Sequence, residues 1–222
     1  MVRGQQRRTG QGQNREEAEE TLRTILRTAQ RLFMEYGYRA VTTRQIASAC
    51  GLTQPALYHY FHDKQELYVA MMHEEVAKMR AALERIARRG ESITERLESM
   101  ATYLLNSSQH DMDIMLHDIR HELSAEARAT LASIFQTGIV APVASVFTAG
   151  IEEGLLRDQE RGGVDAITAT YLFLSMLARQ PDREGPQERA THGTGHSTIF
   201  AGDEQRASMV VRVLLHGLAY PQ

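Results

Sequence analysis

Residues 42–61 read TTRQIASACGLTQPALYHYF, and this stretch decides the fold because it holds the start and stop signals of two short helices. Thr42, with Gln45 three residues later, forms a capping-box pattern that marks the start of the first helix. Gly51 stands where that helix must end, and Thr53 can cap the second helix. Two short helices joined by a tight turn predict a helix-turn-helix, whose second helix enters a DNA groove.

The segment from about Ile25 to Met71 resembles the DNA-binding domain of the TetR (tetracycline-repressor) family, with Leu57–Phe61 followed by Lys64 as its most specific part. The resemblance implies an all-α fold of about nine helices, with an N-terminal three-helix helix-turn-helix domain and a larger C-terminal helical ligand-binding and dimerisation domain. The residues that carry it are Ile25, Ala29, Leu32, Phe33, Gly37, Thr42, Thr43, Ile46, Ala47, Gly51, Leu52, Leu57, Tyr58, His59, Tyr60, Phe61, Lys64 and Leu67.

The composition is typical of a water-soluble globular protein, with 42% hydrophobic and 24% charged residues. The single cysteine, Cys50, argues against an internal disulfide framework and fits a reducing compartment. No uninterrupted apolar run approaches the roughly 18 residues of a membrane span, and the N-terminus lacks the apolar core of a secretory signal. We therefore expect a cytoplasmic protein with no membrane partner.

Charge is distributed unevenly along the chain. Residues 1–69 hold ten Lys and Arg against seven Asp and Glu, whereas residues 70–222 hold fifteen against twenty-one. A basic N-terminal part suits contact with nucleic acid, and an acidic remainder would be repelled by phosphate. The pattern favours site-specific DNA binding over indiscriminate wrapping of DNA.

The domain organisation expected from the sequence is a disordered basic arm over 1–14, a helix-turn-helix domain over 15–68 and a helical domain over 69–222. Pro142 predicts a kink near Gly138, and the polar stretch 181–202 predicts a long loop. Outside the helix-turn-helix motif, helices are expected at 15–36, 64–89, 92–106, 111–123, 125–152, 164–180 and 204–219.

The expected base contacts come from the start of the second helix of the motif and from Arg44 on the first. Arg44 can pair with guanine and Gln54 with adenine, while Pro55 and Ala56 offer apolar surface to a thymine methyl. The resemblance implies base contacts for Arg44, Gln54 and Pro55. Contacts to phosphates are expected from residues with hydroxyl, phenol, imidazole or ammonium groups, namely Thr43, Thr53, Tyr58, His59, Tyr60 and Lys64. Tyr60 is equally suited to packing.

The last two helices are predicted to form a homodimer interface, because the final helix is apolar over most of its circumference and must bury two sides. A dimer would read a palindromic operator in double-stranded DNA. The residues concerned are Met209, Val210, Val211, Val213, Leu214, Leu215, Gly217 and Leu218, with Ile167, Thr170, Tyr171, Leu174, Leu177 and Ala178 on the preceding helix.

The resemblance also implies a ligand pocket among the middle helices, and the methionine-rich sequence favours an adaptable apolar lining. The expected effector is a small hydrophobic molecule such as an acyl chain, an acyl-coenzyme A or a drug-like compound, which releases a repressor from its operator. The available apolar residues are Met100, Tyr103, Leu104, Met112, Met115, Leu116, Ile119, Phe135, Ile139, Val143 and Phe147.

A metal-responsive regulator is the alternative function. Asp113, His117 and His121 fall four residues apart and would share one face of a helix, a spacing that Zn²⁺ or Ni²⁺ can use. The same residues also suit a solvated helix face. The sequence shows no glycine-rich phosphate loop, nucleophile elbow or paired-carboxylate arrangement, so we expect neither an enzyme nor a resident cofactor.

Overall fold

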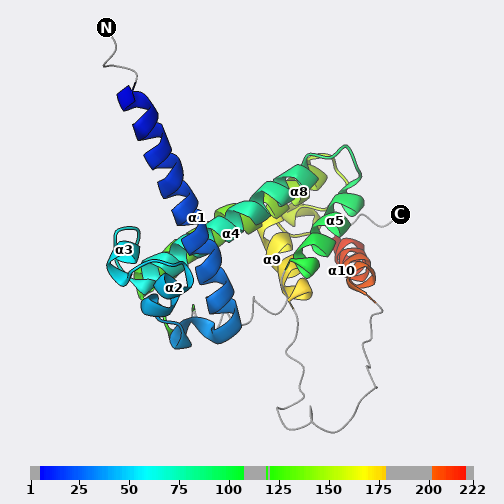
Figure 1. The fold of residues 1–222 in the computed structure, drawn as a ribbon. Coiled ribbons are helices and arrows are strands. Elements are labelled where there is room, and N and C mark those ends of the chain that lie inside the picture. The colour runs from blue at the N-terminus through cyan, green and yellow to red at the C-terminus, as the bar shows by residue number, and fades with distance from the viewer. Residues whose placement is uncertain (1–5, 108–118, 120, 179–201, 219–222) are drawn as a thin grey trace. The chain divides into compact units, whose positions relative to one another are not determined.

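The computed structural model describes residues 6–107, 119, 121–178 and 202–218, which form helices and connecting turns without a β-sheet (Figure 1). This confirms the all-α fold predicted from the sequence. The chain divides into two compact units, one comprising Met1–Ala77 and His110–Ile134 and the other Lys78–Gln109 and Phe135–Gln222. The predicted boundary after residue 68 therefore differs from this division, which cuts through a long helix.

The first unit contains α1 (Gln6–Ala40), α2 (Thr43–Ala49), α3 (Gln54–Tyr58) and the first part of α4 (Lys64–Ala87). Helix α1 begins earlier than the predicted 15–36 segment, so residues 6–14 are helical where a disordered arm was expected. Extending an existing helix adds one hydrogen bond for each residue fixed and needs no new nucleus. At its other end α1 bends at Gly37, whose φ of +77° is easily adopted only by glycine.

The helix-turn-helix forms as its capping pattern predicts. The backbone N–H of Gln45 donates to the Thr42 hydroxyl at 3.2 Å. In return, the backbone N–H of Thr42 donates to the side-chain oxygen of Gln45 at 2.8 Å. Gly51 has a φ of +69°, and the Leu52 amide closes the turn on the Ala47 carbonyl at 2.8 Å. Thr53 then caps α3 by accepting from the Ala56 amide. Three local signals therefore fix the start, stop and restart of the motif.

An aromatic cluster forms the centre of this unit. The rings of Phe33, Tyr38 and Tyr68 lie 5.2–5.7 Å apart, and Phe33 and Tyr68 are fully buried. The same core includes Leu123, Ala127 and Leu131, the last two of which lie on α7 (Ala125–Phe135). These distant residues cover the helix-turn-helix domain, which explains why the unit extends beyond the predicted domain.

The second unit contains the end of α4, α5 (Ile93–Asn106), α8 (Ala141–Glu152), α9 (Ala166–Leu177) and α10 (Asp203–Leu218), with a 3-10 turn at Gln159–Arg161. Helix α5 packs against α10 and α8, and α9 packs against both α8 and α10. Figure 1 shows α5, α9 and α10 grouped together in this unit. Most of the predicted helix 111–123 and of the predicted loop 181–202 lies outside the described residues.

Helices α7 and α8 are joined by a π-helical segment, Gln136–Val140, which includes the position near Gly138 where the sequence predicted a kink. The Pro142 nitrogen has no hydrogen to donate, and the wider turn accommodates this loss. The continuous helix Ala125–Glu152 is long and apolar enough to cross a membrane by length and composition, a feature that the search for uninterrupted apolar runs overlooked. Half of its apolar window is nevertheless buried within the protein, as in a core helix.

We predict that Phe33→Ala lowers the free energy of unfolding by about 3–5 kcal/mol, because it removes a fully buried ring and leaves a cavity. Chemical denaturation followed by circular dichroism measures this change. Tyr36→Ala is the matched control on the same helix: Tyr36 is 58% exposed, so its loss should change stability by less than about 0.5 kcal/mol. Equal effects of the two variants would contradict the assignment of the core.

Candidate functional site

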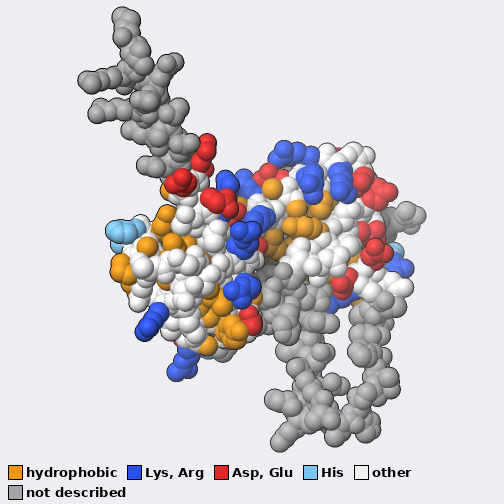
Figure 2. All heavy atoms as spheres, viewed as in Figure 1, with side chains coloured by type: hydrophobic (Ala, Val, Ile, Leu, Met, Phe, Trp, Pro, Cys, Tyr) orange, Lys and Arg blue, Asp and Glu red, His pale blue; other side chains and the backbone are white. Residues whose placement is uncertain are grey.

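The surface of α2 and α3 presents several of the side chains predicted to contact DNA. Arg44, Thr53, Pro55 and His59 are exposed, whereas Leu57 is buried and holds α3 on the core. Figure 2 shows acidic side chains of this unit along α1 and hydrophobic side chains over α2 and α3. Arg44 on α2 is the one Lys or Arg residue that these two helices contain. Ala56 and Tyr60 are partly buried, so Tyr60 both packs against the core and keeps some exposed surface.

Three polar side chains on this surface bind one another. The Gln54 Nε2 group donates to the Thr43 hydroxyl and to the Tyr58 hydroxyl, each at 3.3 Å, and the two hydroxyls are themselves 3.3 Å apart. Hydrogen bonds from Thr43 and then from Gln54 lower the pKa of the Tyr58 phenol from its ordinary value of 10.0. We call Thr43, Gln54 and Tyr58 the Gln54 triad. The sequence analysis placed each residue at the interface but did not foresee that they contact one another.

Lys64 occupies a different position from the phosphate contact predicted for it. Its Nζ donates to the backbone carbonyls of Tyr38 at 2.9 Å and Val41 at 3.0 Å, and lies 4.1 Å from the centre of the Tyr38 ring. The ammonium therefore holds the end of α1 against the start of α4. A lysine at the start of a helix suits phosphate, which is why Lys64 was predicted to contact DNA. Its partners Val41 and Tyr38 lie 23 and 26 residues away, and no local signal in the sequence reveals them.

An exposed apolar face is present on the predicted dimer helices. Ile167, Tyr171 and Leu172 on α9 and Val213 on α10 are 43–55% exposed, while Val210, Val211 and Leu214 on α10 pack inside their own unit. The Tyr171 hydroxyl donates to the Gln136 side chain at 2.7 Å. Helix α10 thus has one side in the core of its unit and one apolar residue facing outward.

The residues predicted to line an apolar ligand pocket are mostly packing residues in this structure. Met100, Val143 and Phe147 are fully buried, Ile139 is 3% exposed, and the rings of Phe147 and Phe173 lie 6.1 Å apart. These side chains therefore belong to the core of their unit in this structure. Leu104 is partly buried and Phe135 is 36% exposed. Ile119 packs on the core of the other unit, and Met112, Met115 and Leu116 lie outside the described residues.

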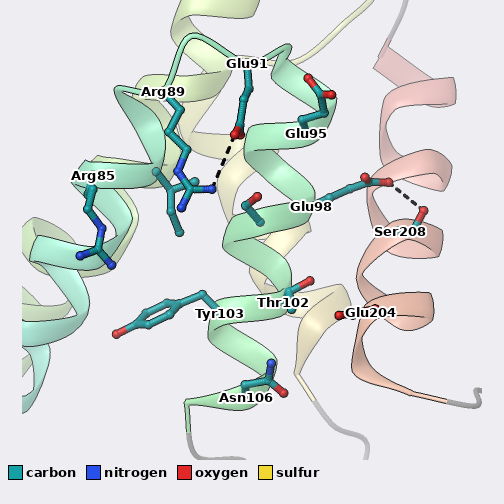
Figure 3. Close-up of a pocket in the computed structure, with 12 residues that line it drawn as sticks. Arg85, Arg89, Glu91, Glu95, Glu98, Thr102, Tyr103, Asn106, Glu204 and Ser208 are labelled. Atoms are coloured by element: carbon teal, nitrogen blue, oxygen red, sulfur yellow. Dashed lines mark hydrogen bonds and ion pairs between the residues drawn. The ribbon is translucent and has the colours of Figure 1, made fainter.

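An open cavity of about 780 Å³ lies in the second unit beside α5, with the end of α4 on one side of that helix and α10 on the other (Figure 3). We call it the α5 cavity. Figure 3 shows Tyr103 extending from α5 toward α4, and Glu98 extending toward α10, where it accepts from the Ser208 hydroxyl at 2.7 Å. Of the residues predicted to bind a ligand, Tyr103 lines this cavity. The complete lining is Arg85, Ile86, Arg89, Glu91, Glu95, Glu98, Ser99, Thr102, Tyr103, Asn106, Glu204 and Ser208.

Two arginines and four glutamates, Glu91, Glu95, Glu98 and Glu204, line the α5 cavity. Arg85 and Arg89 come from α4 and the turn after it, and Arg89 pairs with Glu91 at 3.7 Å. Glu98 and Glu204 lie on the side of α10 (Figure 3). These residues carry no local signal in the sequence, because charged side chains on amphipathic helices usually face water and nothing near them shows which ones surround a cavity.

The metal hypothesis is not tested by this structure. Asp113 and His117 lie outside the described residues, and His121 is described. Within the described part of the chain, no group of three or more His, Cys, Asp and Glu residues is arranged to hold a metal ion.

Comparison with known proteins agrees with the geometry of the first unit. Residues 25–71 match the family model for bacterial regulatory proteins of the tetR family. The transcriptional repressor Rv1474c of Mycobacterium tuberculosis is 40% identical over 63 residues, which is 28% of this chain and 34% of that repressor. The repressor AcnR of Corynebacterium efficiens is 40% identical over 55 residues, covering 25% of this chain and 29% of AcnR. The matched segments thus span about a third of the length of these relatives.

The likeness to solved structures extends over most of the chain. The structure of AibR in complex with isovaleryl coenzyme A and operator DNA is 25% identical, has a TM-score of 0.59, and covers 88% of this chain and 98% of AibR. Both the helix-turn-helix unit and the helical unit therefore have counterparts in a DNA-bound protein.

We predict that Lys64→Met lowers the free energy of unfolding by about 1.5–3 kcal/mol, because two carbonyls lose a charged donor. Denaturant unfolding measures this loss, and fluorescence anisotropy measures affinity for duplex DNA under conditions where the variant is folded. Arg44→Ala is the control, because Arg44 is exposed and should lose DNA affinity while keeping its stability. A Lys64→Met protein that keeps its stability but loses DNA affinity would restore the phosphate role.

Proposed function

Because this chain belongs to the TetR family of bacterial transcriptional regulators, we propose that it is a repressor that binds a palindromic operator as a homodimer and is released by a small molecule. The observation that carries the proposal is the capped helix-turn-helix of α2 and α3, with Arg44 and Pro55 exposed on its surface. The family consists of bacterial regulatory proteins, and on that ground we propose that the chain is a regulator and not an enzyme.

The homodimer is supported by the exposed apolar residues of α9 and α10. A single helix-turn-helix makes few base contacts, and two-fold dimers double them on half-sites about 34–36 Å apart. Ile167, Tyr171 and Val213 would lose their contact with water in such a dimer. Repression is supported by the names of the relatives Rv1474c and AcnR, which are transcriptional repressors.

We predict that the full chain is a dimer by native mass spectrometry and that it enriches two-fold symmetric sites from a pool of random duplexes. Val213→Arg places a charge on the exposed face of α10 and should give a monomer whose operator affinity falls at least tenfold. Leu155→Arg is the matched control, because Leu155 is also 55% exposed but lies outside α9 and α10. A monomeric wild-type chain, or dimers unaffected by Val213→Arg, would contradict this interface.

For the effector we propose an amphipathic anion of the acyl-coenzyme A class, bound in the α5 cavity. Arg85, and Arg89 once it separates from Glu91, would supply cationic groups for phosphate, and Ile86 and Tyr103 would supply apolar surface. The lining also holds Glu95, Glu98 and Glu204, so the phosphates would have to lie on the α4 side. The similarity to AibR, which was solved with isovaleryl coenzyme A, supports this class.

Helix α4 offers a route from effector to DNA. Its last turns carry Arg85 on the α5 cavity, and its first residue, Lys64, holds the end of α1 beside the helix-turn-helix. If α4 can adopt two orientations, a ligand that binds the protein more tightly in one of them shifts the population toward that orientation. The fraction of molecules in the DNA-binding conformation would change accordingly.

We predict that isovaleryl coenzyme A binds the protein and weakens its affinity for operator DNA, as measured by calorimetry and anisotropy. Arg85→Ala should weaken this binding about tenfold or more, because a hydrogen bond to a charged group contributes about 1.5–3 kcal/mol. Arg80→Ala is the control on the same helix, since Arg80 pairs with Glu84 and does not line the cavity. Equal binding by wild type and Arg85→Ala would contradict this site.

A further inference from the structure

The α5 cavity is basic on the side where the end of α4 borders it. Residues 78–89, the last part of α4 and the start of the turn after it, hold five Lys and Arg against one carboxylate, Glu84. Three arginines of this stretch pair with Glu84 or Glu91. Arg85 lines the cavity, and within the described part of the chain its guanidinium has no carboxylate partner. Arg85 is therefore available to an anion in the cavity.

Tyr103 places an aromatic ring on the same side. Figure 3 shows Tyr103 extending from α5 toward α4, the side on which Arg85 and Arg89 lie. Tyr103 is partly buried and lines the cavity, so part of its surface is open to a ligand. An aromatic ring binds a flat base by stacking, and a guanidinium binds phosphate through two parallel N–H groups. Together these two groups match a base joined to phosphates, which is a nucleotide.

The rest of the lining suits a nucleotide better than an acyl chain. Ser99, Thr102 and Asn106 follow one another at intervals of three and four residues on the cavity face of α5, and they offer hydroxyl and amide groups. Among the described residues, Ile86 is the one aliphatic residue that lines the cavity. A ribose and a base can use polar partners, whereas an acyl chain gains affinity from apolar surface.

The carboxylates of the lining confine an anion to the α4 side. Glu95 accepts from the backbone N–H and the hydroxyl of Ser92, at 2.9 and 2.7 Å. Glu98 is bonded to α10, and Glu204 also lies on that side of α5 (Figure 3). Glu91 is the carboxylate that pairs with an arginine of the α4 side, and a phosphate must compete with it there.

We propose that the α4 side of the α5 cavity is an adenine-nucleotide subsite, in which Tyr103 stacks on the base and Arg85 binds phosphate. The inference rests on the proposed function, because it takes the effector to be an acyl-coenzyme A, whose nucleotide end is an adenosine with a 3′-phosphate and a 5′-diphosphate. It adds that the cavity recognises this end of the effector and not the acyl chain. We therefore expect coenzyme A without an acyl group to bind within about threefold of isovaleryl coenzyme A.

Calorimetry with adenosine 3′,5′-bisphosphate tests the subsite in the full chain, because this probe has the base and phosphates but no pantetheine or acyl chain. The wild-type protein should bind it, and it should compete with isovaleryl coenzyme A. Tyr103→Leu should weaken its binding about fivefold or more, because the base loses its stacking partner. Tyr103→Phe keeps the ring and should bind like the wild type. Tyr36→Leu is the matched control, since Tyr36 is an exposed tyrosine outside this cavity.

Salt separates the two contacts of the subsite. Arg85→Ala should weaken binding of the bisphosphate about tenfold at about 50 mM salt and much less at about 0.5 M, because salt screens the attraction between exposed charges. The loss caused by Tyr103→Leu should be the same at both concentrations, because stacking involves no net charge on the tyrosine. Side chains that only support the fold would not give this difference, and circular dichroism checks that each variant is folded.

The opposite results overturn the inference. Binding of isovaleryl coenzyme A without binding of the bisphosphate would show that the nucleotide end is not recognised, and would leave the proposed effector standing. Equal binding of the bisphosphate by wild type and Tyr103→Leu would remove the stacking contact. A loss in Tyr103→Phe as large as that in Tyr103→Leu would assign the effect to the hydroxyl and not to the ring. If neither ligand binds, the proposed effector is contradicted as well.

Discussion

The anchoring of Lys64 to two carbonyls determines where the helix-turn-helix begins. The last carbonyls of a helix have no partner within it. The Lys64 ammonium binds the carbonyl of Tyr38, near the end of α1, and that of Val41, the residue that follows α1. Thr42, which caps α2, follows directly after Val41. The position of α2, and through the turn at Gly51 that of α3, thus depends on a charged group at the start of α4.

The Gln54 triad depends on this placement, because it joins the start of α2 to the start of α3. A free glutamine side chain has several rotatable bonds, and ordering such a side chain on binding costs about 0.5–1.5 kcal/mol. The hydrogen bonds to Thr43 and Tyr58 already order the Gln54 side chain in the folded protein. Part of this loss of side-chain entropy therefore occurs on folding and not on binding. The motif therefore gains a fixed pattern of donors and acceptors and loses some freedom to adapt to other bases.

Local signals in the sequence predicted the helix-turn-helix well. The capping box of Thr42 and Gln45, the turn at Gly51 and the cap at Thr53 all lie within a few residues of their partners. Contacts between distant residues were not predictable. The Ser208 hydroxyl meets Glu98 across 110 positions, and the anchor of Lys64 spans more than 20, so neither leaves a periodic pattern.

The π-helical segment at Gln136–Val140 allows one continuous helix to serve two hydrophobic cores. Before it, Ala127 and Leu131 pack in the first unit, and after it, Val143 and Phe147 pack in the second. In a helix with 3.6 residues per turn, one additional residue rotates everything that follows by about 100°. The wide turn therefore changes which residues of α8 continue the face of α7, and a residue added to or removed from this segment would rotate the whole of α8 about the helix axis.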